Sequence, residues 1–464
     1  MAFTNTLGVA TMKTAFTIRQ LEDPGIAEAD RILQDCVHYG FCVSVCPTYV
    51  LTRDENESPR GRIDLIKEML ESDQPPRPAT VRHIDGCLSC LSCMSTCAAS
   101  VDYAHLVDTA RSHIEEHYRR PLADRLMRGL VAAVIPRPAL MRLALRAARL
   151  AGPIAPLLPG RLRGMVELAP ARRAAAPAIP TGRLLPAEGQ ARRRVALIPG
   201  CAQQALAPHL NEASIRLLRR HGCDVVVPAM SCCGALTLHM GKTGPARRAA
   251  AQTLSTLGRL QREFDLDAII VNASGCGTTM KDYAHLMAGE PQADEAAAIG
   301  GRVRDITEVL LDLGLNPPVR RTGLRVAYHD ACSLQHGQKV VQPPRQLLRQ
   351  AGFEVLDIPE RHFCCGSAGT YNMLQPDTAA ELGRRKAGHI ASTGAHVACA
   401  GNLGCLEQLQ RHASLPLLHT VELLDWATGG PVPASLETLG AIPPAAAPEA
   451  TEANMATADE DTLW

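Results

Sequence analysis

The stretch CLSCLSCMSTCA, residues 87–98, carries four cysteines in the spacing C-x2-C-x2-C-x3-C. In bacterial runs of this spacing, three thiolates bind one face of an iron–sulfur cubane and the fourth binds a second cluster. A structural zinc site is the alternative, but zinc sites usually pair two C-x2-C units that lie further apart. The stretch therefore predicts half of a two-cluster, ferredoxin-like domain, with the ligands Cys87, Cys90, Cys93 and Cys97.

A second stretch, CVHYGFCVSVCP at residues 36–47, follows the same spacing with one replacement. Three cysteines stand at ligand positions, whereas Tyr39 occupies the position of the second cysteine. Because the fourth cysteine of each run binds the cluster of the other run, the thiols divide into two sets. The complete set, which predicts a 4Fe–4S cluster, is Cys46, Cys87, Cys90 and Cys93. The incomplete set, with Tyr39 at its fourth corner, is Cys36, Cys42 and Cys97.

At the cluster corner where Tyr39 replaces a cysteine, three arrangements of the fourth iron are possible. The phenolate binds the fourth iron, a water or hydroxide binds it, or the iron is lost and a 3Fe–4S cluster remains. A phenolate is harder and longer than a thiolate, and water holds the iron weakly. We therefore expect a 3Fe–4S cluster under air and a labile 4Fe–4S cluster under anaerobic conditions. The expected N-terminal cofactors are two iron–sulfur clusters.

An internal repeat occupies most of the remaining chain. VALIPGCA (195–202) matches VAYHDACS (326–333), and DAIIVNASGCG (267–277) matches AHVACAGNLGC (395–405). Between them, GCDVVVPAMSCCGA (222–235) matches GFEVLDIPERHFCCGSAG (352–369). Each copy alternates short β-rich runs with helical stretches, which predicts parallel α/β units. The cysteines follow the strands, at the ends where open α/β sheets place their ligands.

Each repeat supplies four thiols, including an adjacent pair followed by glycine, CCG. Adjacent cysteines bind a single iron poorly but can bind neighbouring irons of one cluster. A cluster in each repeat, one shared site and zinc all stay open, and the alternative without metal is packing as small hydrophobic groups. The candidate metal ligands are Cys201, Cys232, Cys233 and Cys276 in the first repeat and Cys332, Cys364, Cys365 and Cys405 in the second.

Other residues near these motifs receive structural roles. Cys223 and Cys399 have no counterpart in the other repeat, so we expect them in the core. Four histidines near cysteines are interpreted as hydrogen-bonding neighbours rather than ligands, although imidazole can bind iron. These histidines are His38, His329, His336 and His362.

The predicted fold class is α+β multidomain: a mainly helical, two-cluster ferredoxin-like domain, followed by two α/β CCG-type repeats. Residues 119–195 carry sixteen arginines against three acidic residues, with many prolines, which predicts basic helices and a loose linker around 171–189. The predicted segments are a flexible N-terminus (1–25), the ferredoxin-like domain (26–118), the Arg-rich helical segment and linker (119–195), the first CCG repeat (196–320), the second CCG repeat (321–430) and a disordered tail (431–464).

Composition limits the function classes. A formal net charge of +1 argues against nucleic-acid binding. Seventeen cysteines without a recognisable signal peptide favour a reducing, cytoplasmic location over disulfides. No apolar run reaches the ~18 residues that span a bilayer, so any membrane association is expected to be peripheral. No loop typical of nucleotide or flavin binding and no catalytic triad stands apart from the metal pattern.

Taken together, these motifs resemble the family of iron–sulfur subunits of bacterial glycolate oxidase (glycolate dehydrogenase), over residues 26–430. The stretch SPRGRIDLIK (58–67) lies between the two cysteine runs, as in that family. CAQQALAP, CCGALTLHMGK, NASGCG, SLQHGQK and CCGSAGTYNM are also similar to its motifs. This sequence departs from the family pattern at Tyr39, where the family has cysteine, and at Ala273 and Asn402, where a C-x2-C would begin.

The resemblance implies an electron-transfer subunit of a flavin-linked glycolate (2-hydroxy acid) dehydrogenase complex. Partner FAD-binding flavoprotein subunits would oxidise glycolate to glyoxylate, and this chain, with no catalytic residue of its own, would pass electrons to a quinone-type acceptor. It would lie on the cytoplasmic face of the inner membrane. The alternative is a related CCG-family reductase or dehydrogenase subunit, of the glycerol-3-phosphate dehydrogenase or heterodisulfide reductase type.

Overall fold

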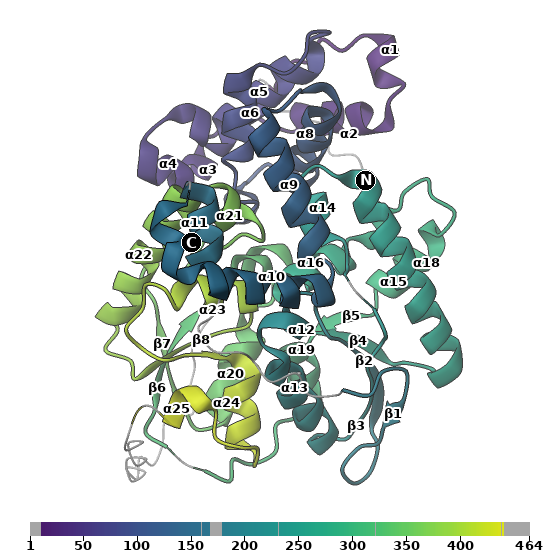
Figure 1. Ribbon diagram of the computed structural model, residues 1–464. Helices are drawn as coiled ribbons and strands as arrows, with labels where there is room; N and C mark the ends of the chain where they lie inside the picture. Colours follow the sequence, from purple (N-terminus) through teal and green to yellow (C-terminus); the bar gives the residue numbers. More distant parts are fainter. Residues whose placement is uncertain are drawn as a thin grey trace, which may run out of the picture.

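The computed structural model describes residues 11–158, 160–167, 179–230, 232–320, 322–437 and 439. A helical N-terminal domain sits above two α/β units, and a helical connector lies across the front between them (Figure 1). This order of elements confirms the predicted fold class. The predicted tail from 440 onwards and residues 1–10 lie outside the described residues.

The N-terminal domain consists of short helices around an aliphatic core that includes Ile32, Leu33, Ile66 and Leu106. Met12 belongs to the same core and donates its backbone N–H to the Cys36 carbonyl at 3.0 Å. Residue 12, in the segment predicted to be flexible (1–25), therefore packs with this domain. The helices are α1 (Ile18–Leu21), α2 (Pro24–Gln34), α3 (Phe41–Ser44), α4 (Pro47–Thr52), the 3-10 helix η1 (Glu55–Glu57), α5 (Pro59–Glu71), α6 (Pro78–Asp85), α7 (Ser92–Thr96) and α8 (Tyr103–His117).

Helix α5 begins sharply, and its start sets the position of Arg62. The Ser58 side chain accepts a hydrogen bond from the Gly61 N–H at 3.0 Å, and Pro59 fills the first helical position. A Cβ added to Gly61 would lie 2.1 Å from the Glu55 carbonyl oxygen, so only glycine allows this close approach. The resulting register turns Arg62 towards the buried face of the helix, where 1% of its surface is exposed.

The connector helices are α9 (Leu122–Val134), α10 (Pro138–Ala151), the 3-10 helix η2 (Gly152–Leu157) and α11 (Gly160–Glu167). Pro138 occupies the first turn of α10, where a missing N–H costs nothing. Val131 and Ile135 pack with Met240 of the first repeat and Leu374 of the second. The connector is thus anchored on both α/β units.

The first repeat forms a five-stranded sheet in the order β1-β3-β2-β4-β5, parallel except for β1. Because β1 and the start of β2 precede residue 196, the repeat begins inside the segment predicted as a linker. Its elements are β1 (Leu184–Leu185), β2 (Arg193–Ile198), α12 (Gln203–Leu206), α13 (Pro208–Arg220), β3 (Cys223–Val226), α14 (Ala235–Leu238), α15 (Thr243–Phe264), β4 (Ala268–Val271), α16 (Ser274–Lys281), α17 (Tyr283–Leu286), α18 (Ala293–Gly300), β5 (Val303–Asp305) and α19 (Ile306–Leu313).

The second repeat forms a four-stranded parallel sheet in the equivalent order β7-β6-β8-β9. Leu436, in the last helix, is 1% exposed and joins the shared core, so ordered structure continues past the predicted boundary at 431. The elements are β6 (Arg325–His329), the π-helix η3 (Ser333–Gly337), α20 (Gln342–Gln350), β7 (Glu354–Asp357), α21 (Tyr371–Leu374), α22 (Pro376–Ser392), β8 (Val397–Ala400), α23 (Leu403–Leu409), β9 (Leu417–His419), α24 (Thr420–Ala427) and α25 (Ala434–Glu437).

The two repeats pack against each other as symmetric partners. The longer helix that follows the first central strand of each copy contacts the helix that directly follows the last strand of the other copy, so α13 meets α24 and α20 meets α19. One apolar core extends across both repeats and includes Cys223 and Cys399, as predicted for these cysteines. Arg216 and Arg220 bind the buried Asp425 carboxylate at 2.7 and 2.9 Å, which fixes the two copies together.

The N-terminal domain contacts the first repeat through stacked imidazole rings. The rings of His105 and His285 lie 3.5 Å apart. The Nδ1 and Nε2 atoms of His105 lie 2.7 and 2.9 Å from the carboxylates of Asp102 and Asp282, and His285 bonds Glu28 at 2.8 Å. This cluster ties the orientation of the domain to charged groups on both sides of the contact.

Candidate iron–sulfur sites

The structure brings Cys36, Cys42 and Cys97 to one small pocket, which we call the Tyr39 site. They come from the loop after α2, from α3 and from the end of α7. Burial, with the neighbouring thiols of Cys36 and Cys97, raises the pKa of Cys42 to about 11. Thiolates held this close repel one another, so their ionised form needs a cation. The three-thiol set has the donor chemistry of an iron–sulfur site.

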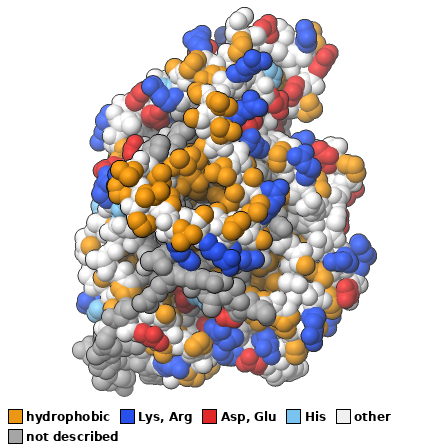
Figure 2. All heavy atoms as spheres, in the orientation of Figure 1, with side chains coloured by type: hydrophobic (Ala, Val, Ile, Leu, Met, Phe, Trp, Pro, Cys, Tyr) orange, Lys and Arg blue, Asp and Glu red, His pale blue; other side chains and the backbone are white. Residues whose placement is uncertain are grey.

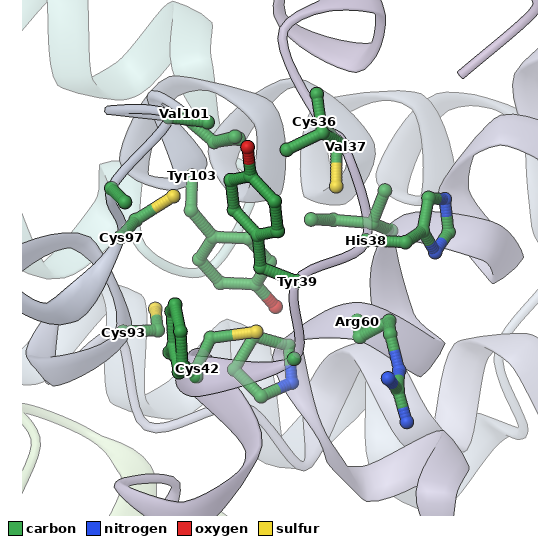
Figure 3. Close-up of a pocket in the computed structure, with 16 residues that line it drawn as sticks. Cys36, Val37, His38, Tyr39, Cys42, Arg60, Cys93, Cys97, Val101 and Tyr103 are labelled. Carbon is green, nitrogen blue, oxygen red and sulfur yellow. The ribbon is translucent and has the colours of Figure 1, made fainter. Parts of the chain in front are cut away.

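Tyr39 lines the same pocket, at its exposed side. The backbone is left-handed at His38 and Gly40, with φ of 55° and 82°, and this turn carries residue 39 to the rim. In Figure 3 the Tyr39 hydroxyl lies on the Val101 side of the pocket, away from the Cys42 sulfur. Because 55% of the Tyr39 surface is exposed, the corner that lacks a thiol is open to water.

The complete set forms a second group, the inner site, whose thiols are all buried: Cys46, Cys87, Cys90 and Cys93. Burial raises the pKa of Cys93 well above its usual value, and the thiols of Cys90 and Cys87 raise it further. Cys46 and Cys42 contribute to the same increase, so the inner site adjoins the Tyr39 site. Four clustered, buried thiols are the ligand set of a cubane cluster.

Arg62 places a buried positive charge beside the inner site. Its guanidinium donates to the Glu57 carboxylate and to the His83 carbonyl, and Nη1 lies 3.9 Å from the Cys46 sulfur. The Tyr103 hydroxyl approaches the Cys87 sulfur at 3.7 Å. These donors offset the negative charge that thiolate ligands bring. From the sequence alone, no role was assigned to Arg62, which lies in SPRGRIDLIK. The position of an arginine on the apolar face of a helix could have indicated that Arg62 is buried beside a functional site.

The four cysteines of the first repeat, the first CCG thiols, lie at the C-terminal ends of β2, β3 and β4. Hydrogen bonds from Cys201 and Cys233 lower the pKa of the Cys232 thiol, and the Gly234 N–H approaches the same sulfur at 3.4 Å. Hydrogen bonding to Cys232 and Cys276 raises the pKa of Cys233. The four thiols thus form one contiguous group.

The second CCG thiols repeat this arrangement. The sulfurs of Cys332 and Cys364 lie 3.8 Å apart, and the Cys365 thiol is hydrogen-bonded to the thiols of Cys364 and Cys405. The Asn402 side chain donates to the Cys405 sulfur at 3.4 Å, so the residue that replaces the expected cysteine still contacts the group.

All eight CCG thiols line one cavity of about 600 Å³, the thiol cavity, together with Cys87. Sequence reasoning left open whether the repeats hold separate sites or one. The structure has two thiol groups, one in each repeat, that face a common space. Leu145 and Ala148 of α10 and Met165 and Val166 of α11 close this space with apolar side chains.

The inner site and the second CCG thiols are in contact. Cys90 packs in one cluster with Cys364 and Tyr371. Burial and the thiols of Cys332 and Cys46 raise the pKa of Cys90 well above its usual value. The thiol groups therefore follow one another without a break: the Tyr39 site, the inner site, and the thiol cavity. All seventeen cysteines are free thiols, and the fifteen outside the shared apolar core lie in these groups.

The four histidines near the cysteines differ in their partners. His336 bonds Ser95 at 2.8 Å and the His362 carbonyl at 3.3 Å, which agrees with a hydrogen-bonding role. His38 lies 3.8 Å from the Asp64 carboxylate. His329 is different, because neither of its ring nitrogens has a hydrogen-bond partner in the described part of the chain.

Among the described residues, no helix combines the length and apolar character needed to cross a membrane.

Comparison with known proteins agrees with this geometry. A family model described as "4Fe-4S dicluster domain" matches residues 32–101, and one described as "Cysteine-rich domain" matches residues 195–281 and 326–410. A solved structure, a hypothetical protein from Helicobacter pylori, superposes with a TM-score of 0.53 at 9% identity over 89% of this chain and 74% of that one. That likeness supports the fold alone.

Two curated relatives match this chain over most of their own length. The "Glycolate oxidase iron-sulfur subunit" of Escherichia coli (strain K12) is 35% identical over 419 residues, 90% of this chain and 99% of that protein. The "Probable glycolate oxidase iron-sulfur subunit" of Bacillus subtilis (strain 168) is 31% identical, over 82% of this chain and 88% of that protein. The chain belongs to the family of glycolate oxidase iron–sulfur subunits.

Proposed function

We propose that this protein carries electrons within a glycolate-oxidising complex, from FAD-binding flavoprotein subunits towards a quinone-type acceptor. The observation that carries the proposal is the unbroken order of thiol groups from the Tyr39 site through the inner site to the thiol cavity. Cys90, which packs against Cys364, joins the N-terminal part of this path to the repeats. Clusters bound along it would give electrons a continuous route through the protein interior.

The substrate is assigned to partner subunits, because the sequence has no loop typical of flavin or nucleotide binding. Each cluster supplies reversible one-electron transfer when bound. The role of this chain is then to hold the clusters with thiolates, to keep water from the inner site, and to balance charge with Arg62. We place the complex in the cytoplasm, on the inner face of the cytoplasmic membrane.

The test uses anaerobically purified full-length protein, alone and together with its flavoprotein partners. The isolated chain should give no glycolate-dependent dye reduction, whereas the complex should reduce the dye and the chain should copurify with a flavoprotein. Glycolate-dependent dye reduction by the single chain would refute the proposal that partner subunits oxidise the substrate. Failure to copurify with any flavoprotein would argue against the complex itself.

The thiol cavity favours a second candidate, a catalytic reductase of the heterodisulfide-reductase type. A cavity of about 600 Å³ lies within the range of small-molecule sites, and its walls carry eight thiols that could act on a bound substrate. A related subunit of the glycerol-3-phosphate dehydrogenase type remains the other alternative. Substrate-dependent turnover of disulfides, glycolate and glycerol 3-phosphate by the partnered complex separates the three.

A further inference from the structure

His329 is an unpaired polar group in the interior of the second repeat. It ends strand β6, it is 2% exposed, and neither Nδ1 nor Nε2 has a hydrogen-bond partner among the described residues. Buried side-chain polar atoms are almost always paired, so an imidazole with two unpaired nitrogens calls for a partner that the polypeptide does not supply.

The surroundings of His329 identify that partner as a metal. A ring nitrogen of His329 and the sulfurs of Cys365 and Cys405 all lie within 4.8 Å of one another. Tetrahedral ligand atoms at bond lengths of about 2.0–2.3 Å from one metal lie about 3.3–3.8 Å apart, so these three atoms would have to approach one another by no more than about 1.5 Å. The buried Lys386 ammonium lies near the thiols of Cys364 and Cys365 and adds positive charge to the group.

The equivalent position of the first repeat carries an isoleucine, Ile198, in place of the histidine. Ile198 ends strand β2 and pairs with Val271, as His329 ends β6 and pairs with Ala400. Each precedes the first CCG cysteine of its repeat, Cys201 or Cys332, by three residues. Two otherwise matched sites therefore differ in that one has an imidazole where the other has the branched alkyl side chain of Ile198.

We propose that the imidazole of His329 binds the metal centre of the second CCG repeat, together with Cys365 and Cys405. A mixed thiolate–imidazole set suits an iron–sulfur cluster or zinc. The inference deepens the proposed function and rests on it in one respect, that the second CCG thiols hold a metal. If the metal is an iron–sulfur cluster, an imidazole ligand in addition to the thiolates should give it a reduction potential different from that of the first repeat, because ligands and net charge help to set the potential.

The experiment compares the anaerobically purified full-length protein with His329→Ile, which copies the first repeat, His329→Cys and Cys365→Ser. His336→Asn is the control, because His336 is a neighbouring buried histidine whose two nitrogens are already hydrogen-bonded. Iron, zinc and acid-labile sulfide are counted per chain. Pulsed EPR reports nitrogen coupling to an iron centre, and X-ray absorption reports nitrogen ligation of zinc.

His329→Ile should lose nitrogen ligation and the metal of one site, His329→Cys should keep the metal without nitrogen ligation, and His336→Asn should match the wild type. Circular dichroism checks that His329→Ile remains folded. If Cys365→Ser lowers the metal content but His329→Ile leaves content and nitrogen coupling unchanged, the His329 ligand is wrong and the metal site stands. If neither variant changes the metal content per chain, the second repeat holds no metal at these residues, and both the metal site and the His329 ligand are wrong.

A separate observation concerns the outer face of the connector helices. Nine of the fifteen large hydrophobic side chains that are exposed among the described residues lie between Leu122 and Leu162. Leu150 and Leu157 are each 84% exposed. Figure 2 shows this apolar patch across α10 and α11, with basic side chains along its lower border. Soluble surfaces rarely leave so many aliphatic side chains together in water.

The charge of the same segment indicates what covers it. Residues 122–167, from the start of α9 to the end of α11, contain eight arginines against two acidic residues, Asp124 and Glu167. Amphipathic helices with leucine on one face and arginine on the other lie in the interface of anionic bilayers. We infer that α9–α11 dock onto an anionic membrane surface. Because the same helices close the thiol cavity, a lipid-soluble acceptor could pass from the bilayer to the second CCG thiols, a step that rests on the proposed function.

The test is sedimentation of the complex with vesicles of phosphatidylglycerol and phosphatidylcholine, against phosphatidylcholine alone. The double variant Leu150→Glu/Leu157→Glu is compared with Val319→Glu, an exposed apolar residue (65%) outside the patch. The wild type and Val319→Glu should bind anionic vesicles, less so at high salt, and the double variant should not.

Two results would overturn the membrane assignment. In the first, the double variant binds anionic vesicles as well as the wild type does. In the second, the double variant still binds vesicles but no longer copurifies with the flavoprotein. Dye reduction by the complex is measured alongside and should persist in the double variant. If the wild-type complex does not reduce the dye, the proposed function is wrong. Vesicle binding would still test whether α9–α11 dock onto a membrane.

Discussion

Replacing Tyr39 by cysteine should complete the ligand set of the Tyr39 site. The native site offers the thiols of Cys36, Cys42 and Cys97, and its fourth corner faces solvent beside a tyrosine that is 55% exposed. Three thiolates hold three irons, and the fourth iron has only water or a poorly directed phenol. After oxidation the native site should therefore keep a 3Fe–4S cluster, whereas Tyr39→Cys should keep four irons, a gain of about one iron per chain.

The assay must separate this site from the CCG repeats, which can also hold iron. Protein purified anaerobically is oxidised and examined by EPR, and iron is counted before and after. The native protein should show a 3Fe–4S signal that Tyr39→Cys lacks. Tyr39→Phe is the matched control, since it keeps the ring and removes the hydroxyl, and it should behave like the native protein.

Two stable 4Fe–4S clusters in oxidised native protein would refute the reasoning. If Tyr39→Phe then converted one of them to a 3Fe–4S cluster, the Tyr39 hydroxyl would be the fourth ligand. If Tyr39→Phe left both unchanged, a different group in the pocket, such as His38, would hold the iron.

Three further predictions follow from buried charges and thiols. Cys233→Ser and Cys365→Ser should each lower the iron, zinc or sulfide content, and no change in either would identify them as packing residues. Arg62→Gln should lower the potential of the inner-site cluster in an EPR redox titration and cost about 3 kcal/mol in urea unfolding, because Glu57 loses its buried partner. Burial lowers the pKa of His105, but its two carboxylate partners outweigh this and raise it to about 10. His105→Gln should thus cost about 1–2 kcal/mol below pH 6.5, and the cost should vanish as the pH rises through 10.

Local spacing predicted the parts of this fold that depend on neighbours in sequence. The alternation of short β-rich runs with helical stretches predicted parallel α/β units. The structure has them: in the first repeat, strands Arg193–Ile198 and Ala268–Val271 flank helix Thr243–Phe264 in the chain. Such elements follow from hydrophobic period and turn residues, which the sequence displays directly.

What spacing could not predict depends on contacts between distant segments. The packing of Cys90 against Cys364 joins residues that lie in different domains. Three long-range contacts lie outside the predicted domain boundaries near 25, 195 and 431. Met12 and Leu436 pack in apolar cores, and Leu185 pairs with β3. His329 carried a visible signal, its place three residues before Cys332, but only the structure reveals that its nitrogens are unpaired.

The order of the thiol groups also sets the direction in which electrons would travel under the proposed function. The Tyr39 site opens to solvent between exposed aromatic rings, since Tyr39 and Phe41 are both more than half exposed. The inner site is fully enclosed and touches the thiol cavity through Cys90. The cavity in turn lies beneath apolar helices that suit a membrane. A soluble donor has access at the first point and a lipid-soluble acceptor at the last, so entry at the Tyr39 site and exit from the CCG repeats is the arrangement that the exposed surfaces favour.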